Sequence, residues 1–165
     1  MTPLFSEASR HPIQASPLLA GTSLYEGPRW RADAEFAEMQ RAFAPYAGMS
    51  TGDELLLRAS RSRPLPISSL ARPIARRELV SLMHRGQLLL PNFQFEPGSL
   101  QLLPAMTEIV LELRDVFDDW DLALWFAMPN VVLQHARPVD LLASRGSGVS
   151  EVREAARVDR FIALG

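Results

Sequence analysis

The pattern of apolar and polar positions predicts three long helices. Between residues 101 and 114, apolar side chains recur at i, i+3 or i+4, and i+7, and charged side chains occupy the opposite face. Residues 29–43 show near-helical spacing and run into Pro45, which ends the helix. Residues 149–164 form a third amphipathic stretch. The apolar positions, in chain order, are Trp30, Phe36, Met39 and Phe43; Leu102, Leu103, Met106, Ile109, Val110 and Leu113; and Val152, Ala155, Ala156, Val158, Phe161 and Ile162.

Two short helices are predicted between residues 50 and 77. The run Ser50–Glu54 is typical of a helix start, and Leu55–Ala59 follow it. Ser68 or Ser69 can begin a second helix that reaches Arg77. Two short helices joined by a basic connector at residues 61–66 resemble part of a helix-turn-helix. The alternative is an ordinary pair of packed helices with a solvated arginine face, and the sequence leaves both open.

A β-hairpin is predicted over residues 78–95. Residues 78–84 and 87–95 flank Arg85-Gly86, a candidate two-residue turn, and in the first arm Val80, Leu82 and His84 alternate with Leu79, Ser81 and Met83. Pro91 argues against a central strand, so the second arm is expected at an edge or a bulged exit. A hairpin after two helices could act as a wing on DNA or could cover a core face.

Short helices are predicted again after residue 117. Asp118 or Asp119 begins one that ends at Met128-Pro129, Asn130 caps a second over 131–133, and Arg137-Pro138 begins a third. The first of these carries Trp125 and Phe126. Such aromatic residues usually belong to the core, but neighbours on a helix point about 100° apart, so one of them could face a partner.

These elements predict a mainly α fold with a small β-hairpin, in which a compact helical bundle follows a degenerate helix-turn-helix-like first half. Residues 1–28 contain four prolines without apolar periodicity and are expected to form a flexible arm. Residues 29–86 form the helical segment, with the hairpin at its end. Residues 87–165 form a second unit.

The charge distribution indicates an anionic partner. The net charge is −2, but residues 58–86 hold seven arginines against one acid, whereas residues 1–57 hold four against seven and residues 87–165 hold six against eleven. A basic island in an acidic chain is typical of a surface that meets phosphates. The candidate DNA contacts are Arg58, Arg61, Arg63, Arg72, Arg76 and Arg77.

The sequence contains no arrangement that indicates catalysis. Cysteine is absent, which excludes disulfides and thiolate chemistry. The carboxylates at 118, 119 and 121 are explained by helix capping, and the three histidines lack ligand spacing. No metallopeptidase, nucleophile-elbow or phosphate-loop motif occurs. We therefore expect a non-enzymatic protein without metal or cofactor, and the absence of a signal or spanning segment favours the cytoplasm.

Several motifs in the second half occur in a recognisable order. They are Pro91–Phe95, Asp119–Phe126, Pro129-Asn130, Arg137–Leu142 and the helix Val152–Arg160. In order and spacing this block resembles the toxin-binding domain of the Xre/MbcA/ParS antitoxin family. The resemblance covers roughly the last 75 residues, and the first half does not show a full Xre-type DNA-binding head.

The resemblance implies a small antitoxin that binds a RES-fold toxin, a class of NAD-consuming or ADP-ribosylating enzymes, and blocks its active site. It also implies operator binding as a homodimer. The alternative is a stand-alone DNA-binding transcriptional regulator. The residues expected to bind the toxin are Trp125, Phe126, Pro129, Asn130, Arg137, Pro138, Arg153, Arg157 and Arg160.

Overall fold

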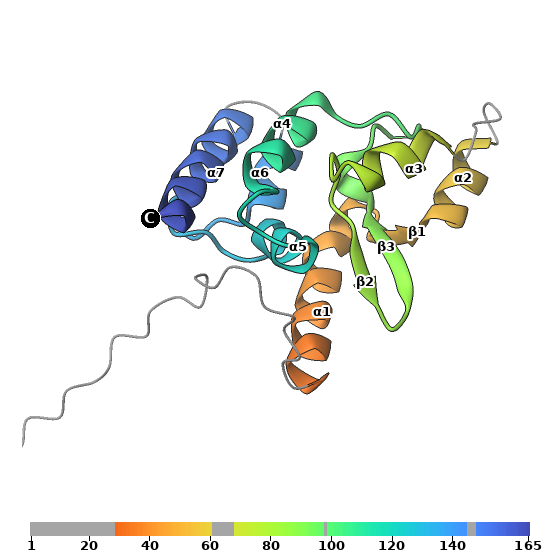
Figure 1. Cartoon of the computed structure of the whole chain (residues 1–165), viewed down its shortest axis with the longest axis horizontal. Helices are drawn as coiled ribbons and strands as arrows, with labels where there is room; N and C mark the ends of the chain where they lie inside the picture. The colour runs from red at the N-terminus through yellow and green to blue at the C-terminus, as the bar shows by residue number, and fades with distance from the viewer. Residues whose placement is uncertain (1–28, 61–67, 98, 145–147) are drawn as a thin grey trace, which may run out of the picture.

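A computed structural model describes residues 29–60, 68–97, 99–144 and 148–165 (Figure 1). The described chain is mainly helical with a small antiparallel sheet, which confirms the predicted fold class. The predicted arm at 1–28 and the candidate contacts Arg61 and Arg63 lie outside these residues. The elements are α1 (Arg29–Phe43), η1 (Ala44–Tyr46), β1 (Met49–Thr51), α2 (Gly52–Ser60), α3 (Ser68–Ala75), β2 (Leu82–His84), β3 (Gln87–Pro91), η2 (Asn92–Gln94), α4 (Pro104–Leu113), α5 (Asp119–Ala127), α6 (Pro138–Ala143) and α7 (Gly148–Leu164).

Local capping explains where several helices begin. Thr51 and Glu54 form a capping box, because the Thr51 hydroxyl accepts from the Glu54 N–H and the Glu54 carboxylate accepts from the Thr51 N–H. The Asp118 carboxylate accepts from the Asp121 N–H at 2.8 Å and caps α5, as predicted. No helix within the described ranges is long and apolar enough to cross a membrane.

The sheet corrects the predicted hairpin in one respect. The strand order is β1-β3-β2, so β3 is the central strand, and the edge position predicted from Pro91 is wrong. Pro91 is tolerated because it is the last residue of β3, opposite Met49 of β1. The turn is as predicted: Arg85 and Gly86 have φ of +48° and +79°, which two-residue hairpin turns require.

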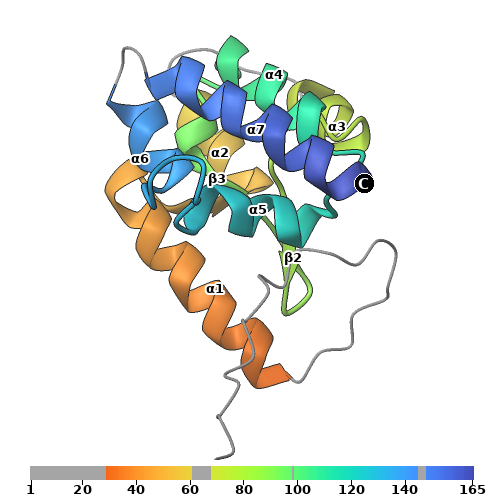
Figure 2. The same cartoon turned by 90° about the vertical axis from the view of Figure 1, so that its left-hand side faces the viewer.

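Two apolar clusters flank β3. The larger one joins α1, β2, α4, α5 and α7 around fully buried Phe43 and Phe126. The smaller one lies under α2 and α3 and contains Leu70 and Leu90. The expected boundary between residues 86 and 87 falls in the hairpin turn, and α1 shares its core with the C-terminal helices. Figure 2 shows α4, α5 and α7 gathered above α1.

Two predicted helical features differ from the structure. The segment after Asn130 is a hydrogen-bonded turn, not a helix, and Gln134 and His135 adopt left-handed φ angles of +53° and +67°. The apolar face predicted for the last helix is buried only in its first part, because Phe161 and Ile162 are 76% and 54% exposed. The apolar positions of this helix therefore continue beyond the point where neighbouring elements cover it.

Candidate interaction surfaces

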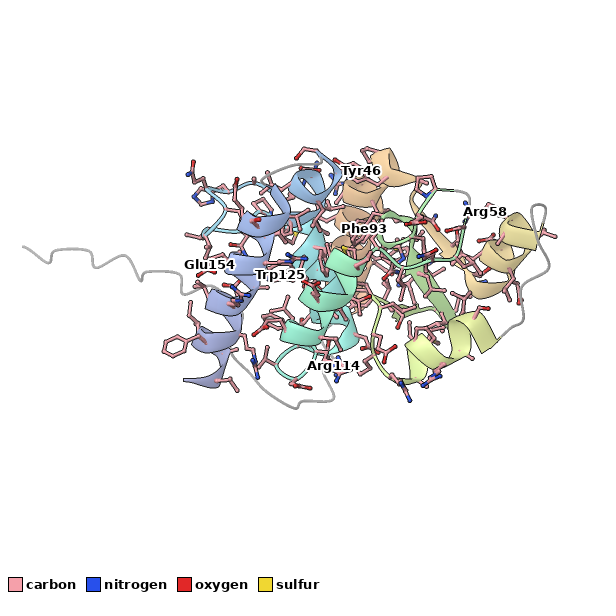
Figure 3. The ribbon with its side chains drawn as sticks, turned by 90° about the horizontal axis from the view of Figure 1, so that it is seen from above. Tyr46, Arg58, Phe93, Arg114, Trp125 and Glu154 are labelled. Carbon is pink, nitrogen blue, oxygen red and sulfur yellow. The ribbon has the colours of Figure 1, made fainter. Side chains whose placement is uncertain are left out.

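A shared carboxylate organises the region around Trp125. Asp159 of α7 accepts a hydrogen bond from Trp125 Nε1 at 2.7 Å and another from Asn130 Nδ2 at 2.6 Å. Trp125 is only 5% exposed and points from α5 toward α7 (Figure 3). One acid thus fixes α5, the following turn and α7 relative to one another.

Most of the residues expected to bind a partner are used inside the molecule. Phe126 is fully buried and packs edge-on against Trp125, with ring centroids 4.9 Å apart. Both aromatics therefore belong to the core, and the alternative in which one faces a partner does not hold in this structure. Pro138 is also buried, at the start of α6.

Arg137 belongs to a network that ties α6 to η1, the short helix that follows α1. Its guanidinium contacts both carboxylate oxygens of Asp140, at 2.7 and 3.1 Å, and the Tyr46 hydroxyl donates to the same carboxylate at 2.8 Å. Burial raises the pKa of Tyr46, and the hydrogen bond to Asp140 raises it further. The hydrogen bond to Asp140 also raises the pKa of Arg137.

The three arginines of α7 have different roles. Arg153 pairs with Glu108 at 2.6 Å and Arg160 pairs with Glu112 at 2.9 Å, so both join α7 to α4. Arg157 pairs only within its own helix, with Glu154 at 3.4 Å, and its side chain is 64% exposed. Of the three, Arg157 remains the most accessible.

Apolar side chains remain exposed next to the Asp159 network. In the turn after α5, Met128, Val131 and Val132 are 42%, 72% and 41% exposed, and Pro129 is also exposed. Ile162 lies about one helical turn after Asp159 on α7 and is also exposed. We call residues 128–132 the apolar turn. Pro129 and Asn130 of this turn were among the predicted partner-binding residues, but Met128, Val131 and Val132 were not, because the two valines after a predicted cap indicated a short helix.

The basic island forms an arginine-bearing helix face. On α3, the exposed residues are Ala71, Arg72 and Ala75, and Arg76, the first residue after the helix, is exposed as well. Arg76 is 54% exposed in its side chain and has a weak ion pair with Glu78 at 3.6 Å. Arg58 is exposed at the end of α2 (Figure 3), and its guanidinium contacts Ser50 and Asn92.

Arg77 has a structural role, because its guanidinium binds acceptors within the protein instead of facing an anionic partner. It donates to the carbonyls of Arg114 and Phe117 at 2.6 and 2.7 Å and to the Asp119 carboxylate at 2.7 Å. In return, Arg114 donates to the Arg76 carbonyl at 2.7 Å. These contacts cap the end of α4 and attach the segment after α3 to it.

Within the described ranges, no three His, Asp or Glu side chains lie close enough together to hold a metal ion. His84 instead stacks on Phe36, with ring centroids 3.7 Å apart. Asp140 and Asp159 each organise a separate hydrogen-bond network. The sequence gives no indication of the role of Asp159, whereas the three-residue spacing between Arg137 and Asp140 could have been recognised.

Comparison with known proteins gives one structural similarity. No family model matches the sequence, and no curated protein matches it. Among solved structures, the chain is similar to the NMR structure of Rv2175c, with 22% identity over 66% of this chain and 78% of that chain. The TM-score is 0.49, so the two backbones agree only in part.

Proposed function

We propose that this chain is an antitoxin-like protein that binds a protein partner through its C-terminal unit. The family resemblance suggests a RES-type toxin, an NAD-consuming or ADP-ribosylating enzyme, as the partner. The observation that carries the proposal is the exposed apolar turn. This turn directly follows α5, which contains one of the motifs that resemble the antitoxin family. Exposed apolar side chains that gather at one place commonly mark protein–protein contact sites.

The apolar turn suits binding because its shape is already fixed. The Asn130 N–H donates to the Ala136 carbonyl at 3.0 Å, and the Asn130 carbonyl accepts from the His135 N–H at 2.9 Å. The Asn130 side chain is held by Asp159. A preorganised surface loses less conformational entropy on association than a mobile one.

The proposed interface differs from the one expected from sequence. Val131, Val132 and Pro129 would contact the partner directly, and Arg157 would lie at the polar rim. Trp125 and Asn130 would contribute indirectly, by holding the apolar turn in its conformation. The chain would neutralise the toxin by covering its active site, so the proposed role is binding in the cytoplasm without catalysis.

Growth rescue tests this proposal. The protein encoded beside this chain would be expressed in cells with the wild type, with Val131→Asp, or with Met83→Asp as a matched control. Met83 is 57% exposed on the hairpin, so its replacement by aspartate introduces the same charge away from the apolar turn. We expect rescue by wild type and M83D and loss of rescue by V131D. Equal rescue by all three would refute the proposed interface, and a harmless neighbouring protein would refute the antitoxin role.

A second candidate function is operator binding by the first half, and it has a specific observation in its favour. The chain order β1, α2, α3 and hairpin places two helices before a possible wing. Arg72 on α3 and Arg76 directly after it are exposed beside Ala71 and Ala75. Small side chains let a helix approach DNA closely while the arginines reach phosphates or bases. We infer that a homodimer would present two such helices to a symmetric operator.

Gel shifts on the chain's own promoter test the second candidate. The double change Arg72→Ala with Arg76→Ala should weaken binding and lower its salt dependence by about two phosphate contacts. Arg41→Ala is the control, because Arg41 is an exposed arginine of α1 that pairs with Glu38. A wild-type chain that shifts no DNA at low salt would remove this candidate and leave the toxin-binding proposal standing.

A further inference from the structure

The tip of the hairpin carries an exposed cation outside the DNA contacts expected from the sequence. Arg85 is the first residue of the two-residue turn, and its side chain is 74% exposed. The hairpin projects from the sheet, with this turn at its end (Figure 1). Arg85 can therefore approach a polyanion without any rearrangement of the core.

An acidic residue of α1 lies next to this tip. Asp33 Oδ1 is 3.2 Å from Arg85 Nη2 and 3.8 Å from His84 Nε2. The Asp33 side chain is itself 48% exposed. An ion pair between two exposed side chains is weak, so a phosphate can compete with Asp33 for the guanidinium.

Packing holds Asp33 beside the tip. Phe36, one turn further along α1, stacks on His84 at an interplanar angle of 8°. Trp120 of α5 stacks at 6.3 Å from His84, and its Nε1 donates to Glu35 at 2.9 Å. The base of the hairpin is thus fixed against α1. A groove of about 600 Å³ opens along the same contact, and Asp33, His84 and Arg85 line it.

We propose that Arg85 contacts a backbone phosphate of duplex DNA and that Asp33 weakens DNA binding by competing for it. This inference rests on the proposed operator binding. In the complex, a phosphate oxygen replaces Asp33 Oδ1 as the acceptor for Arg85, while Arg72 and Arg76 contact other parts of the duplex. Asp33 also repels the phosphate, because its negative charge stays fixed near the tip.

Fluorescence anisotropy with a labelled duplex of about three helical turns, taken from the chain's own promoter, tests this inference over a range of salt concentrations. The variants are Asp33→Asn, Arg85→Ala, and both changes together. Glu38→Gln is the matched control: Glu38 lies on the same helix, its side chain is 49% exposed, and its loss changes the net charge by the same amount. All of the substituted side chains lie at the surface, and circular dichroism checks that each variant is folded.

Asp33→Asn should bind roughly three- to tenfold more tightly at low salt, because both the competitor and the repulsion are removed. Arg85→Ala should bind more weakly, with a salt slope lower by about one contact. In the Arg85→Ala background, Asp33→Asn should give a smaller gain than in the wild type, because the competition acts through Arg85 and only the direct repulsion is left to remove. Equal gains from Asp33→Asn and Glu38→Gln, or an unchanged slope for Arg85→Ala, would overturn the inference. A wild type that binds no duplex would overturn operator binding and this inference together.

Discussion

Trp125 Nε1 donates a hydrogen bond to the Asp159 carboxylate at 2.7 Å and so connects α5 to α7. Because Asn130 donates to the same oxygen, this contact also determines where the chain goes after α5. The exposed apolar side chains of residues 128–132 are presented by that segment. A partly buried polar contact therefore shapes the surface to which we assign partner binding.

Replacing Asp159 by alanine should reduce both stability and partner binding. The change leaves the Trp125 N–H, which lies on a nearly buried side chain, and the Asn130 amide without their acceptor. Loss of a partner for a buried donor costs about 1–3 kcal/mol. Denaturant unfolding should register this loss, and partner affinity should fall further than the loss of folded protein explains. Unaltered partner affinity in Asp159→Ala would argue against its role in holding the turn.

Replacing Gln94 by leucine should be among the most destabilising changes in the chain. Gln94 is fully buried; its Oε1 accepts from the Val80 N–H at 2.7 Å, and its Nε2 donates to the Val80 and Pro91 carbonyls. Leucine has a similar volume but leaves these backbone groups unpaired, at a cost of roughly 2–4 kcal/mol. Urea unfolding measures the difference. A loss below about 1 kcal/mol would mean that water or a local shift replaces the amide.

Alkaline pH should destabilise the fold through Tyr46. The pKa of Tyr46 is raised in the folded state, so its contribution to stability is complete below the ordinary tyrosine pKa of 10.0 and is lost as the pH rises through the folded value. Tyr46→Phe should remove this part of the alkaline loss. Unfolding curves measured at several pH values provide the comparison, and an identical pH dependence for the variant would contradict the assignment.

Asp140→Ala should lower the pKa of Tyr46 without restoring it fully. Burial is the largest cause of the rise and would remain, whereas the hydrogen bond and the charge of Asp140 would be gone. Phenolate absorbance reports the titration, and Tyr46→Phe identifies the signal of the other tyrosine, Tyr25. A Tyr46 pKa that rises in Asp140→Ala would show that the carboxylate does not act as described.

The arginines of α7 should separate into stability and binding roles. Arg153→Ala and Arg160→Ala each remove an ion pair to α4, and exposed pairs of this kind are worth about 0–1 kcal/mol. Arg157→Ala should leave the unfolding free energy almost unchanged and weaken partner binding, mainly through the association rate. Stopped-flow association and thermal unfolding distinguish the two roles. Equal binding by Arg157→Ala would place the interface elsewhere.

Local rules were enough to predict many of the elements. The limits of α1 follow from its apolar spacing and Pro45, the hairpin turn follows from Arg85-Gly86, and the start of α5 follows from Asp118. Each of these signals depends on residues within a few positions of one another. The three-residue strand β1 could not be predicted, because so short a segment becomes a strand only by pairing with β3.

The candidate surface was predicted less well than the fold. The sequence marked Trp125 and Asn130 but could not show that both depend on Asp159, which lies about thirty residues further along the chain and becomes a neighbour only where α5 meets α7. Arg77 had the same charge as Arg72, yet only tertiary contacts direct it onto the end of α4. These roles depend on hydrogen bonds and ion pairs between residues that are far apart in the sequence, and local spacing cannot reveal such contacts.

Hydrogen–deuterium exchange on the complex with the proposed partner protein tests the central claim most directly. If residues 128–132 form the interface, the amides of Val131 and Val132, together with those near Ile162, should gain protection when the partner binds, while α3 should exchange as in the free chain. Protection confined to α3 or the hairpin, with the apolar turn exchanging freely in the complex, would contradict the account.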